Sequence, residues 1–189
     1  MSYESGSEEV YMPEADTFLL LRAAHAEATS NDLTLEIGSG SGLVSQELAF
    51  KVKRLIATDI NPHAVRATKE KGVEVVRADL FSGIKGKFDL ILFNPPYLPT
   101  LAKERTPQWI NYALDGGVSG RETIDRFLKA LSDHLRPGGR ALLLISSLTG
   151  LKEVQETAMA EGLDMKEAAR DRCFFEELYV LRLEEALDP

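Results

Sequence analysis

The chain has 189 residues, of which 44% are hydrophobic and 28% charged, and its formal net charge at pH 7 is −8. This composition is typical of a globular protein, and no stretch approaches the roughly 18 apolar residues of a membrane span. We therefore expect one domain, 1–189, with no membrane partner, and the acidic balance disfavours nucleic acid as a stable partner because phosphate-binding proteins normally have a basic face.

The N-terminus is polar and acidic, so it does not resemble a signal peptide. The single cysteine, Cys173, allows no internal disulfide, and a cytoplasmic setting fits this usage. The three histidines have no metal-ligand spacing, so no metal site is expected.

Helical and strand-like patterns alternate along the chain. The first element is a helix over 16–26, for which Asp16 is the natural N-cap, and Asn61 is expected to cap a later helix. The later helices are expected through Val44 and Leu48 and over 63–71, 121–135 and 151–161, and the strands over 33–37, 54–58, 73–77, 88–93 and 141–145, before a hairpin over 164–182. This order predicts an α/β fold with a doubly wound, seven-stranded, mostly parallel sheet and a C-terminal antiparallel hairpin.

The expected strand 88–93 runs into Asn94-Pro95-Pro96-Tyr97. Neither proline has an N–H, so the strand must end there, at the carboxyl edge where open α/β sheets bind ligands. The Asn94 side chain and the free backbone carbonyls are suited to accept both hydrogens of a planar –NH2 group, with the Tyr97 ring against its plane. A rigid structural loop is the alternative interpretation.

A second candidate site follows the strand 33–37, in Glu36-Ile37-Gly38-Ser39-Gly40-Ser41-Gly42. Alternate glycines allow a tight turn that a ligand can approach closely, although a purely structural turn is the alternative. The spacing matches neither the nicotinamide-type G-x-G-x-x-G pattern nor a phosphate-binding P-loop.

Asp59 and Asp79 end the strands 54–58 and 73–77, so together with Glu36 they place three carboxylates around one crevice. Asp59 is suited to accept ribose hydroxyls, and Asp79, beside the backbone of Leu80, to accept an adenine amino group. Carboxylates are poor partners for a pyrophosphate but suit S-adenosylmethionine, which has an amine, a ribose, a cationic centre and no phosphate. A helix N-cap is the alternative role for Asp59.

The segment 98–120 is longer than most connections in a compact domain. A functional loop at the substrate site is one interpretation, and a disordered insertion is the other. Trp109 and Tyr112 favour partial order, either over the site or in packing.

Taken in order, these segments resemble the motifs of class I S-adenosylmethionine-dependent methyltransferases: 36–42, Asp59, Asp79-Leu80-Phe81 and Asn94-Pro95-Pro96-Tyr97. The last of these is similar to the turn of enzymes that methylate planar amino or amide nitrogens. Residues 114–121 resemble the Asp-Gly-Gly segment of HemK-type protein-glutamine methyltransferases, and residues 11–20 resemble the N-terminal segment of their short eukaryotic and archaeal branch. The bacterial relatives carry an additional N-terminal helical domain, for which this chain has no room.

The resemblance implies S-adenosylmethionine as cofactor and assigns a role to each matching position. Glu36 and Gly38 would contact its methionine part and Asp59 its ribose, and the whole implied cofactor set is Thr17, Glu36, Gly38, Gly40, Asp59, Asp79, Leu80 and Asn94. The implied substrate-binding set is Asn94, Pro95, Pro96 and Tyr97, of which Asn94, Pro95 and Tyr97 would be catalytic.

The resemblance also implies a substrate, namely the side-chain amide of a glutamine in the Gly-Gly-Gln motif of a class I translation release factor. The alternatives are a nucleic-acid methyltransferase acting on adenine or guanine amino groups, a protein lysine methyltransferase, and a binding module that only activates a partner. The short branch often works with a small zinc-binding activator protein, which would pair with the edge strand 73–77. Within the single domain we expect an N-terminal segment, 1–15, and a substrate loop, 98–120.

Overall fold

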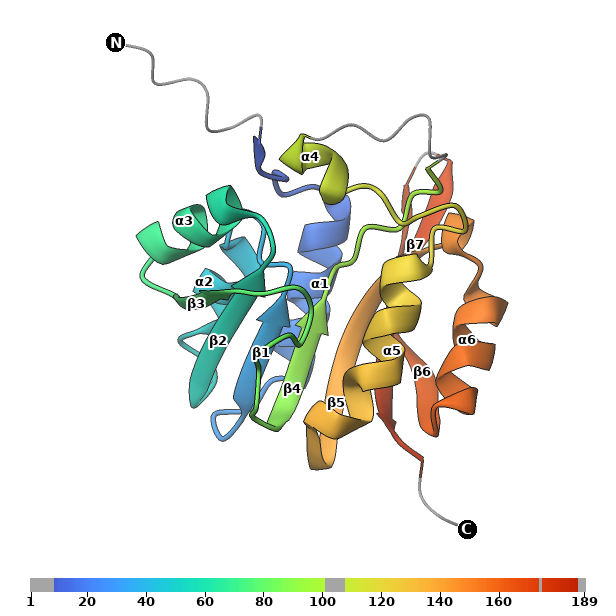
Figure 1. Cartoon of the computed structure of the whole chain (residues 1–189). Helices are drawn as coiled ribbons and strands as arrows, with labels where there is room; N and C mark the ends of the chain where they lie inside the picture. The colour runs from blue at the N-terminus through green and yellow to red at the C-terminus, as the bar shows by residue number, and fades with distance from the viewer. Residues whose placement is uncertain (1–8, 101–107, 174, 187–189) are drawn as a thin grey trace.

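The computed structural model describes residues 9–100, 108–173 and 175–186. A seven-stranded sheet forms its centre, with helices on both faces (Figure 1). The strands are β1 (Leu33–Ile37), β2 (Arg54–Asp59), β3 (Glu74–Arg77), β4 (Phe88–Phe93), β5 (Leu135–Ser146), β6 (Leu163–Cys173) and β7 (Glu176–Glu185). The helices are α1 (Ala15–Glu27), α2 (Leu43–Leu48), α3 (Pro62–Glu70), α4 (Trp109–Tyr112), α5 (Glu122–His134) and α6 (Leu151–Ala160), with a 3-10 turn η3 (Ser147–Thr149).

The strand order is β3-β2-β1-β4-β5-β7-β6. Strands β1 to β5 are all parallel to one another, and β7 is antiparallel to both β5 and β6. This arrangement confirms the predicted fold. The chain order reverses between β1 and β4, so the carboxyl ends of these two strands form the crevice at which doubly wound sheets bind ligands.

Residues 1–8 of the expected N-terminal segment and residues 101–107 of the expected substrate loop lie outside the described residues. Within the part that is described, no helix has the length and apolar character needed to cross a membrane.

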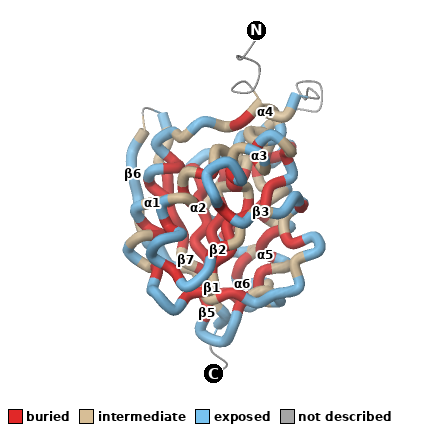
Figure 2. The backbone as a smooth tube through the Cα atoms, turned by 90° about the vertical axis from the view of Figure 1, so that its left-hand side faces the viewer, coloured by how far each residue is buried: buried red, intermediate tan, exposed pale blue. Residues whose placement is uncertain are grey.

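Both faces of the sheet are buried, as the apolar runs of the central strands require. In β4, Leu90 and Leu92 pack in the cluster with α1 and α2, while Ile91 and Phe93 pack in the cluster with α5 and α6. Figure 2 shows that buried residues concentrate in these central strands, whereas β6 at one edge is largely exposed.

The start of α1 differs from the prediction. The N-cap position is Glu14, and Asp16 lies inside the first turn, where its carboxylate is buried instead of capping the helix. The predicted cap of α3 is confirmed, because the Asn61 side chain accepts a hydrogen bond from the backbone N–H of His63 and Pro62 is at the first helical position.

The fifth strand is longer than predicted. It begins at Leu135 because the pairing with β4 shifts register between Phe88 and Leu90, which places the Pro137–Gly139 turn inside a bulge. Only a glycine fits at position 139 in this bulge, because a Cβ there would lie 2.8 Å from the carbonyl oxygen of Phe88.

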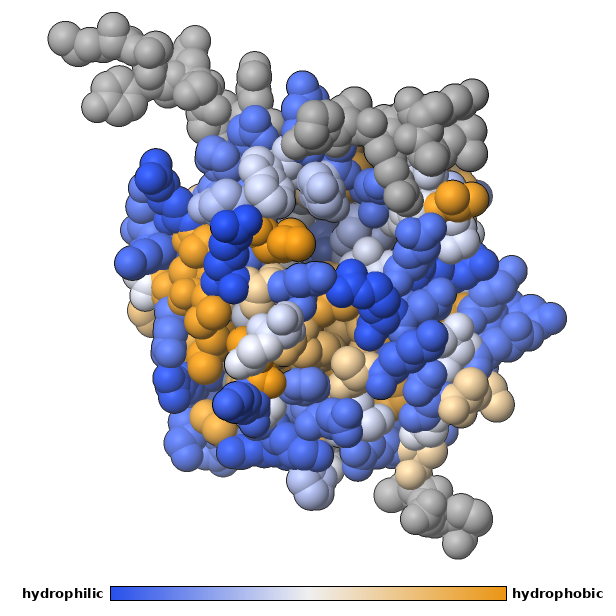
Figure 3. Space-filling model, in the orientation of Figure 1, coloured by the Kyte–Doolittle hydropathy of each residue, from blue (hydrophilic) through white to orange (hydrophobic). Residues whose placement is uncertain are grey.

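The connection between β3 and β4, residues 78–87, contains no helix. One face of β2 and β3 therefore lacks the helical cover that α5 gives to β4 and β5 (Figure 1). Figure 3 shows apolar surface on this side of the molecule, and Val76 of the edge strand β3 is 45% exposed.

Candidate active site

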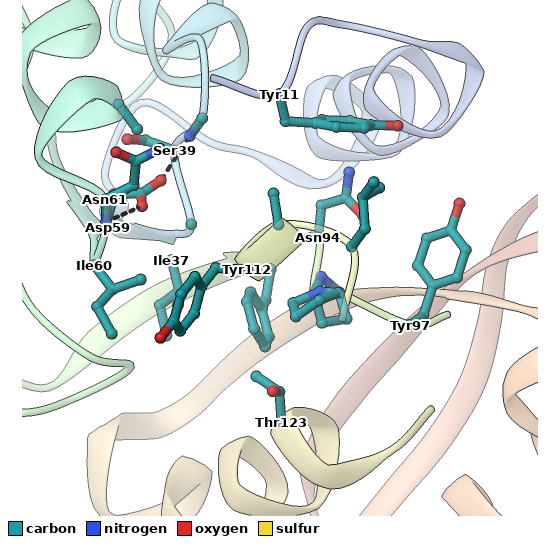
Figure 4. Close-up of a pocket in the computed structure, with 18 of the residues that line it drawn as sticks. Tyr11, Ile37, Ser39, Asp59, Ile60, Asn61, Asn94, Tyr97, Tyr112 and Thr123 are labelled. Atoms are coloured by element: carbon teal, nitrogen blue, oxygen red, sulfur yellow. Dashed lines mark hydrogen bonds between the residues drawn. The ribbon is translucent and has the colours of Figure 1, made fainter. Parts of the chain in front are cut away.

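A cavity of about 410 Å³ lies at the carboxyl ends of β1, β2 and β4. The glycine-rich turn and Asp59 line one end, and Asn94 and Tyr97 line the other, with Tyr11 above (Figure 4). The structure therefore brings together every predicted site residue: Thr17, Glu36, Gly38, Gly40, Asp59, Asp79, Leu80, Asn94, Pro95, Pro96 and Tyr97 all line this cavity.

The glycine-rich turn is shaped by close packing against α3. Gly42 has a φ of +76°, and a Cβ there would lie 2.8 Å from Oγ1 and 2.9 Å from Cα of Thr68. Any residue larger than glycine would therefore clash with α3. Gly38 also has a positive φ, and its missing side chain leaves the backbone open to the cavity. Gly42 thus allows α2 to pack close to α3, and Gly38 leaves space for a ligand.

Glu36 is buried at the end of β1, where it accepts a hydrogen bond from the Ser45 hydroxyl. Burial raises its pKa to about 8, and the neighbouring charge of Asp59 adds to the rise. A cation that enters the cavity would lower this pKa, so its binding favours the ionised form of the Glu36 carboxyl group.

Asp59 accepts hydrogen bonds from the backbone N–H groups of Gly40, at 2.9 Å, and Asn61, at 2.8 Å. Burial nevertheless raises its pKa. These bonds fix the carboxylate at the end of β2, and each oxygen keeps a further lone pair for a hydroxyl donor.

Asp79 and Leu80 form the next part of the wall. Asp79 makes an ion pair of 2.7 Å with Arg126 of α5, and both side chains are partly exposed. Among the described residues other than glycine, Leu80 is the one with a positive φ, which is 49°. A bulky residue in this conformation is strained, and such strain often marks a place where the backbone is held for a ligand.

The turn after β4 is held by a residue that sequence reasoning assigned to capping. Asp16 is 4% exposed, and its Oδ2 atom accepts hydrogen bonds from the Tyr11 hydroxyl, at 3.0 Å, and from Nδ2 of Asn94, at 3.2 Å. Because a carboxylate only accepts hydrogen bonds, it holds the –NH2 end of the Asn94 amide and leaves the carbonyl oxygen to bind another group. The only sequence signal for this role was the position of Asp16 beside Thr17 in the N-terminal motif.

The described part of the segment 98–120 covers the cofactor end of the cavity. Leu98 forms a parallel bridge with Asp115, and Trp109 and Tyr112 of α4 line the cavity with their rings 5.3 Å apart. The N–H of Trp109 donates to Glu9 at 3.1 Å, and the Glu9 carbonyl accepts from Asn61 at 2.7 Å. Partial order is expected for this segment, either over the site or in packing, and in the described residues Trp109 and Tyr112 lie against the cavity.

These groups fit S-adenosylmethionine. The cavity lies within the roughly 300–1,000 Å³ typical of cofactor sites, its acidic groups suit an ammonium and a sulfonium, and the glycine turn offers open backbone. The single cationic residue in its described lining, Arg126, is already paired with Asp79, so the cavity is poorly suited to a phosphate.

Comparison with known proteins agrees with this geometry. Residues 14–110 match the family described as Methyltransferase small domain. A relative from Methanocaldococcus jannaschii, provisionally named a protein N5-glutamine methyltransferase, is 43% identical over 92% of this chain and 90% of its own length. Methyltransferase HEMK2 of Mus musculus is 38% identical over 92% of this chain and 89% of its own length.

The chain belongs to this methyltransferase family. Its fold is also that of a chain in the E. cuniculi Mtq2–Trm112 complex, which is described as responsible for methylation of the eRF1 translation termination factor. The TM-score is 0.78 at 28% identity, over 94% of this chain and 99% of that one. The predicted family, the class I fold, the methyltransferase activity and the dependence on S-adenosylmethionine are confirmed.

The contact between Asp16 and Asn94 leads to a kinetic prediction. Asp16→Ala should lower kcat by on the order of 10²-fold, because the Asn94 amide loses the contact that orients it. Cofactor affinity should change little, and Asp16→Asn, which keeps an acceptor oxygen, should retain more activity. Tyr11→Phe is the control, since it removes a hydrogen bond to the same carboxylate but leaves Asn94 held. Equal losses in D16A and Y11F would contradict this role.

The raised pKa of Glu36 predicts a pH-dependent affinity for the cofactor. A bound cation favours the ionised carboxylate, so binding should release a proton from Glu36 below pH 8. Affinity should therefore be complete above this pKa and fall as the pH falls below it. Isothermal titration calorimetry at about pH 7, in buffers of different ionisation enthalpy, measures the proton count. Proton release that is the same in wild type and Glu36→Gln would contradict the assignment.

Proposed function

We propose that this methyltransferase modifies the side-chain amide nitrogen of a glutamine in the Gly-Gly-Gln motif of a class I release factor. The observation that carries the proposal is the hydrogen bond from Nδ2 of Asn94 to the buried Asp16 carboxylate, which leaves Oδ1 of Asn94 as an oriented acceptor. Pro95 lines the same cavity, and its backbone carbonyl would be the second acceptor. Two fixed acceptors match the two hydrogens of a planar amide. The names of the relatives, and the eRF1 methylation stated for the E. cuniculi complex, support the same substrate.

S-adenosylmethionine supplies an electrophilic methyl group when it is bound. Glu36 and Gly38 would hold its methionine part, Asp59 its ribose and Asp79 with Leu80 its adenine, while Thr17, Gly40 and Asn94 complete the contacts. All of these residues line the same cavity.

The residues of the turn after β4 would act on the target nitrogen. An amide nitrogen is a weak nucleophile, because its lone pair is delocalised into the carbonyl group. Asn94 Oδ1 and the Pro95 carbonyl would fix its plane and stabilise the positive charge that develops on it, with Tyr97 and Pro96 packed beside the group. No histidine is in the described lining of the cavity, so the proton would leave to water after the transfer.

The cavity disfavours the alternative substrates. Asp16, Asp59 and Asp79 give it an acidic lining, which disfavours the phosphates that accompany an adenine or guanine base. A lysine ammonium is tetrahedral and carries three hydrogens, so it matches a pair of acceptors less well than an amide does.

We also propose the finer organisation that the sequence suggests: one methyltransferase domain over 1–189, a cytoplasmic location, and a substrate loop within 98–120. The described end of that loop meets the turn after β4 closely, since a Cβ on Gly120 would lie 2.6 Å from the Tyr97 carbonyl oxygen. The described end of the loop therefore packs against the substrate end of the cavity.

Transfer of labelled methyl groups tests the substrate. A class I release factor of the eukaryotic–archaeal type should be labelled, and the same factor with its Gly-Gly-Gln glutamine changed to asparagine should not. Asn94→Ala should lower kcat by on the order of 10²–10³-fold, whereas Asn31→Ala, a change at an exposed asparagine, should not. Equal labelling of both factors would contradict the proposal.

A small activator protein is the proposed partner, as the Mtq2–Trm112 complex suggests. Strand β3 is an edge of the sheet, and its face lacks helical cover, so an added strand would both pair with its backbone and bury Val76. The proposed partner is a zinc-binding protein, as the resemblance to the short branch implies.

Val76→Asp should abolish co-sedimentation with a Trm112-type protein, because it places a charge in the proposed interface. Met159→Asp on α6, where the native side chain is 67% exposed, is the matched control and should bind normally. Thermal unfolding of both variants alone separates lost binding from lost folding. Normal binding by V76D would exclude this edge.

A further inference from the structure

A second hollow, of about 540 Å³, adjoins the substrate end of the active-site cavity. Tyr11, Asp16 and Tyr97 line both spaces, so the two lie next to each other at the turn after β4. The far wall of the second hollow comes from η3 and from the tip of the C-terminal hairpin. We call it the hairpin groove, and that wall consists of Leu148, Cys173, Phe175, Glu176 and Leu178.

The wall of the hairpin groove exposes apolar side chains. Phe175 is 98% exposed and Leu148 is 55% exposed, and neither contributes to the core clusters. Single exposed apolar side chains are common on protein surfaces. A ligand that covers both of these side chains would remove their apolar surface from water, which favours binding.

The wall is also held in place. The Ser146 hydroxyl donates to Glu176, the N–H of Glu177 donates to the Ser147 hydroxyl at 3.1 Å, and Arg22 of α1 pairs with Asp171 of β6 at 2.9 Å. The hydroxyls of Ser146 and Ser147 therefore tie the start of β7 to the segment before α6, and an exposed ion pair joins β6 to α1. A groove with fixed walls can bind an extended segment without first being ordered.

Charge narrows the choice of occupant. Glu14, Asp16 and Glu176 line the groove, and no Lys or Arg is in its described lining. Burial raises the pKa of the Tyr97 hydroxyl, and these carboxylates raise it further, which reports a negative potential at this point. The groove therefore disfavours a polynucleotide and an acidic peptide alike.

The two ends of the active-site cavity differ in access. Trp109 of α4, bonded to Glu9, covers the cofactor end, whereas the hairpin groove lies beside the substrate end and shares Tyr97 with it. A polypeptide that places one side chain at Asn94 must continue along the surface on at least one side, and the hairpin groove is a hollow next to that point.

We propose that the hairpin groove binds the stretch of the polypeptide substrate next to the target residue. It accepts an extended segment with a bulky apolar side chain against Leu148 and Phe175, and it rejects acidic side chains there. This inference rests on the proposed function, because it states where the chain that carries the target amide leaves the active site.

The test uses Phe175→Ala and the double variant with Leu148→Ala. With the release factor as substrate, KM should rise about tenfold in the double variant, while kcat at saturation and cofactor affinity stay unchanged. The control is Phe50→Ala, because Phe50 is 93% exposed and precedes β2, which is separated from the hairpin of β7 and β6 by three strands of the sheet. Unchanged KM in the double variant would overturn the proposal.

Peptides around the target glutamine give a second readout. A peptide with leucine beside the glutamine should be preferred over one with alanine or glutamate, and the preference for leucine should shrink in the double variant but not in F50A. A preference that is equal in all the proteins would count against the groove.

Direct binding separates this inference from the proposed reaction. Release-factor affinity is measured by fluorescence anisotropy in the Asn94→Ala background, with and without the groove substitutions. Weaker binding in the groove variants supports the groove even if wild-type protein transfers no methyl group to the factor, a result that would remove only the proposed reaction. Equal affinity in all variants would exclude the groove as the docking site.

Discussion

The hydrogen bond between Asp16 and Asn94 connects the two parts of the molecule on which the site depends. It joins the first turn of α1 to the end of β4, two elements 78 positions apart in the chain. The Asp16 carboxylate is buried, and as an acceptor it can hold only the –NH2 end of the amide. The side-chain oxygen that the substrate needs is thereby oriented before any substrate arrives, which lowers the entropic cost of catalysis.

The opposite end of the cavity keeps carboxyl groups where burial opposes their charge. Burial raises the pKa of both Glu36 and Asp59. The backbone N–H groups of Gly40 and Asn61 offset this cost for Asp59, and the Ser45 hydroxyl does so in part for Glu36. The remaining cost is relieved when a cation binds, so the same burial that destabilises the free carboxylates favours a sulfonium or ammonium ligand.

Much of the fold and of the site was predictable, because local chemistry determined it. The double proline had to end β4, the glycines had to form a turn, and Asn61 with Pro62 had to start α3. The role of Asp16 was not predictable in the same way, because its partner is remote in sequence and its position alone resembles a helix cap. Similarly, the bulge in β5 brings Gly139 close to Phe88 of β4, a contact between strands that local propensity does not predict.

The most direct test of the account is a crystal structure with S-adenosylhomocysteine and a Gly-Gly-Gln peptide. The account predicts that the glutamine amide nitrogen lies within hydrogen-bonding distance of Asn94 Oδ1 and the Pro95 carbonyl oxygen, with Nδ2 of Asn94 still bound to Asp16. A glutamine amide bound elsewhere, or an Asn94 amide turned so that its –NH2 group faces the substrate, would contradict the central claim.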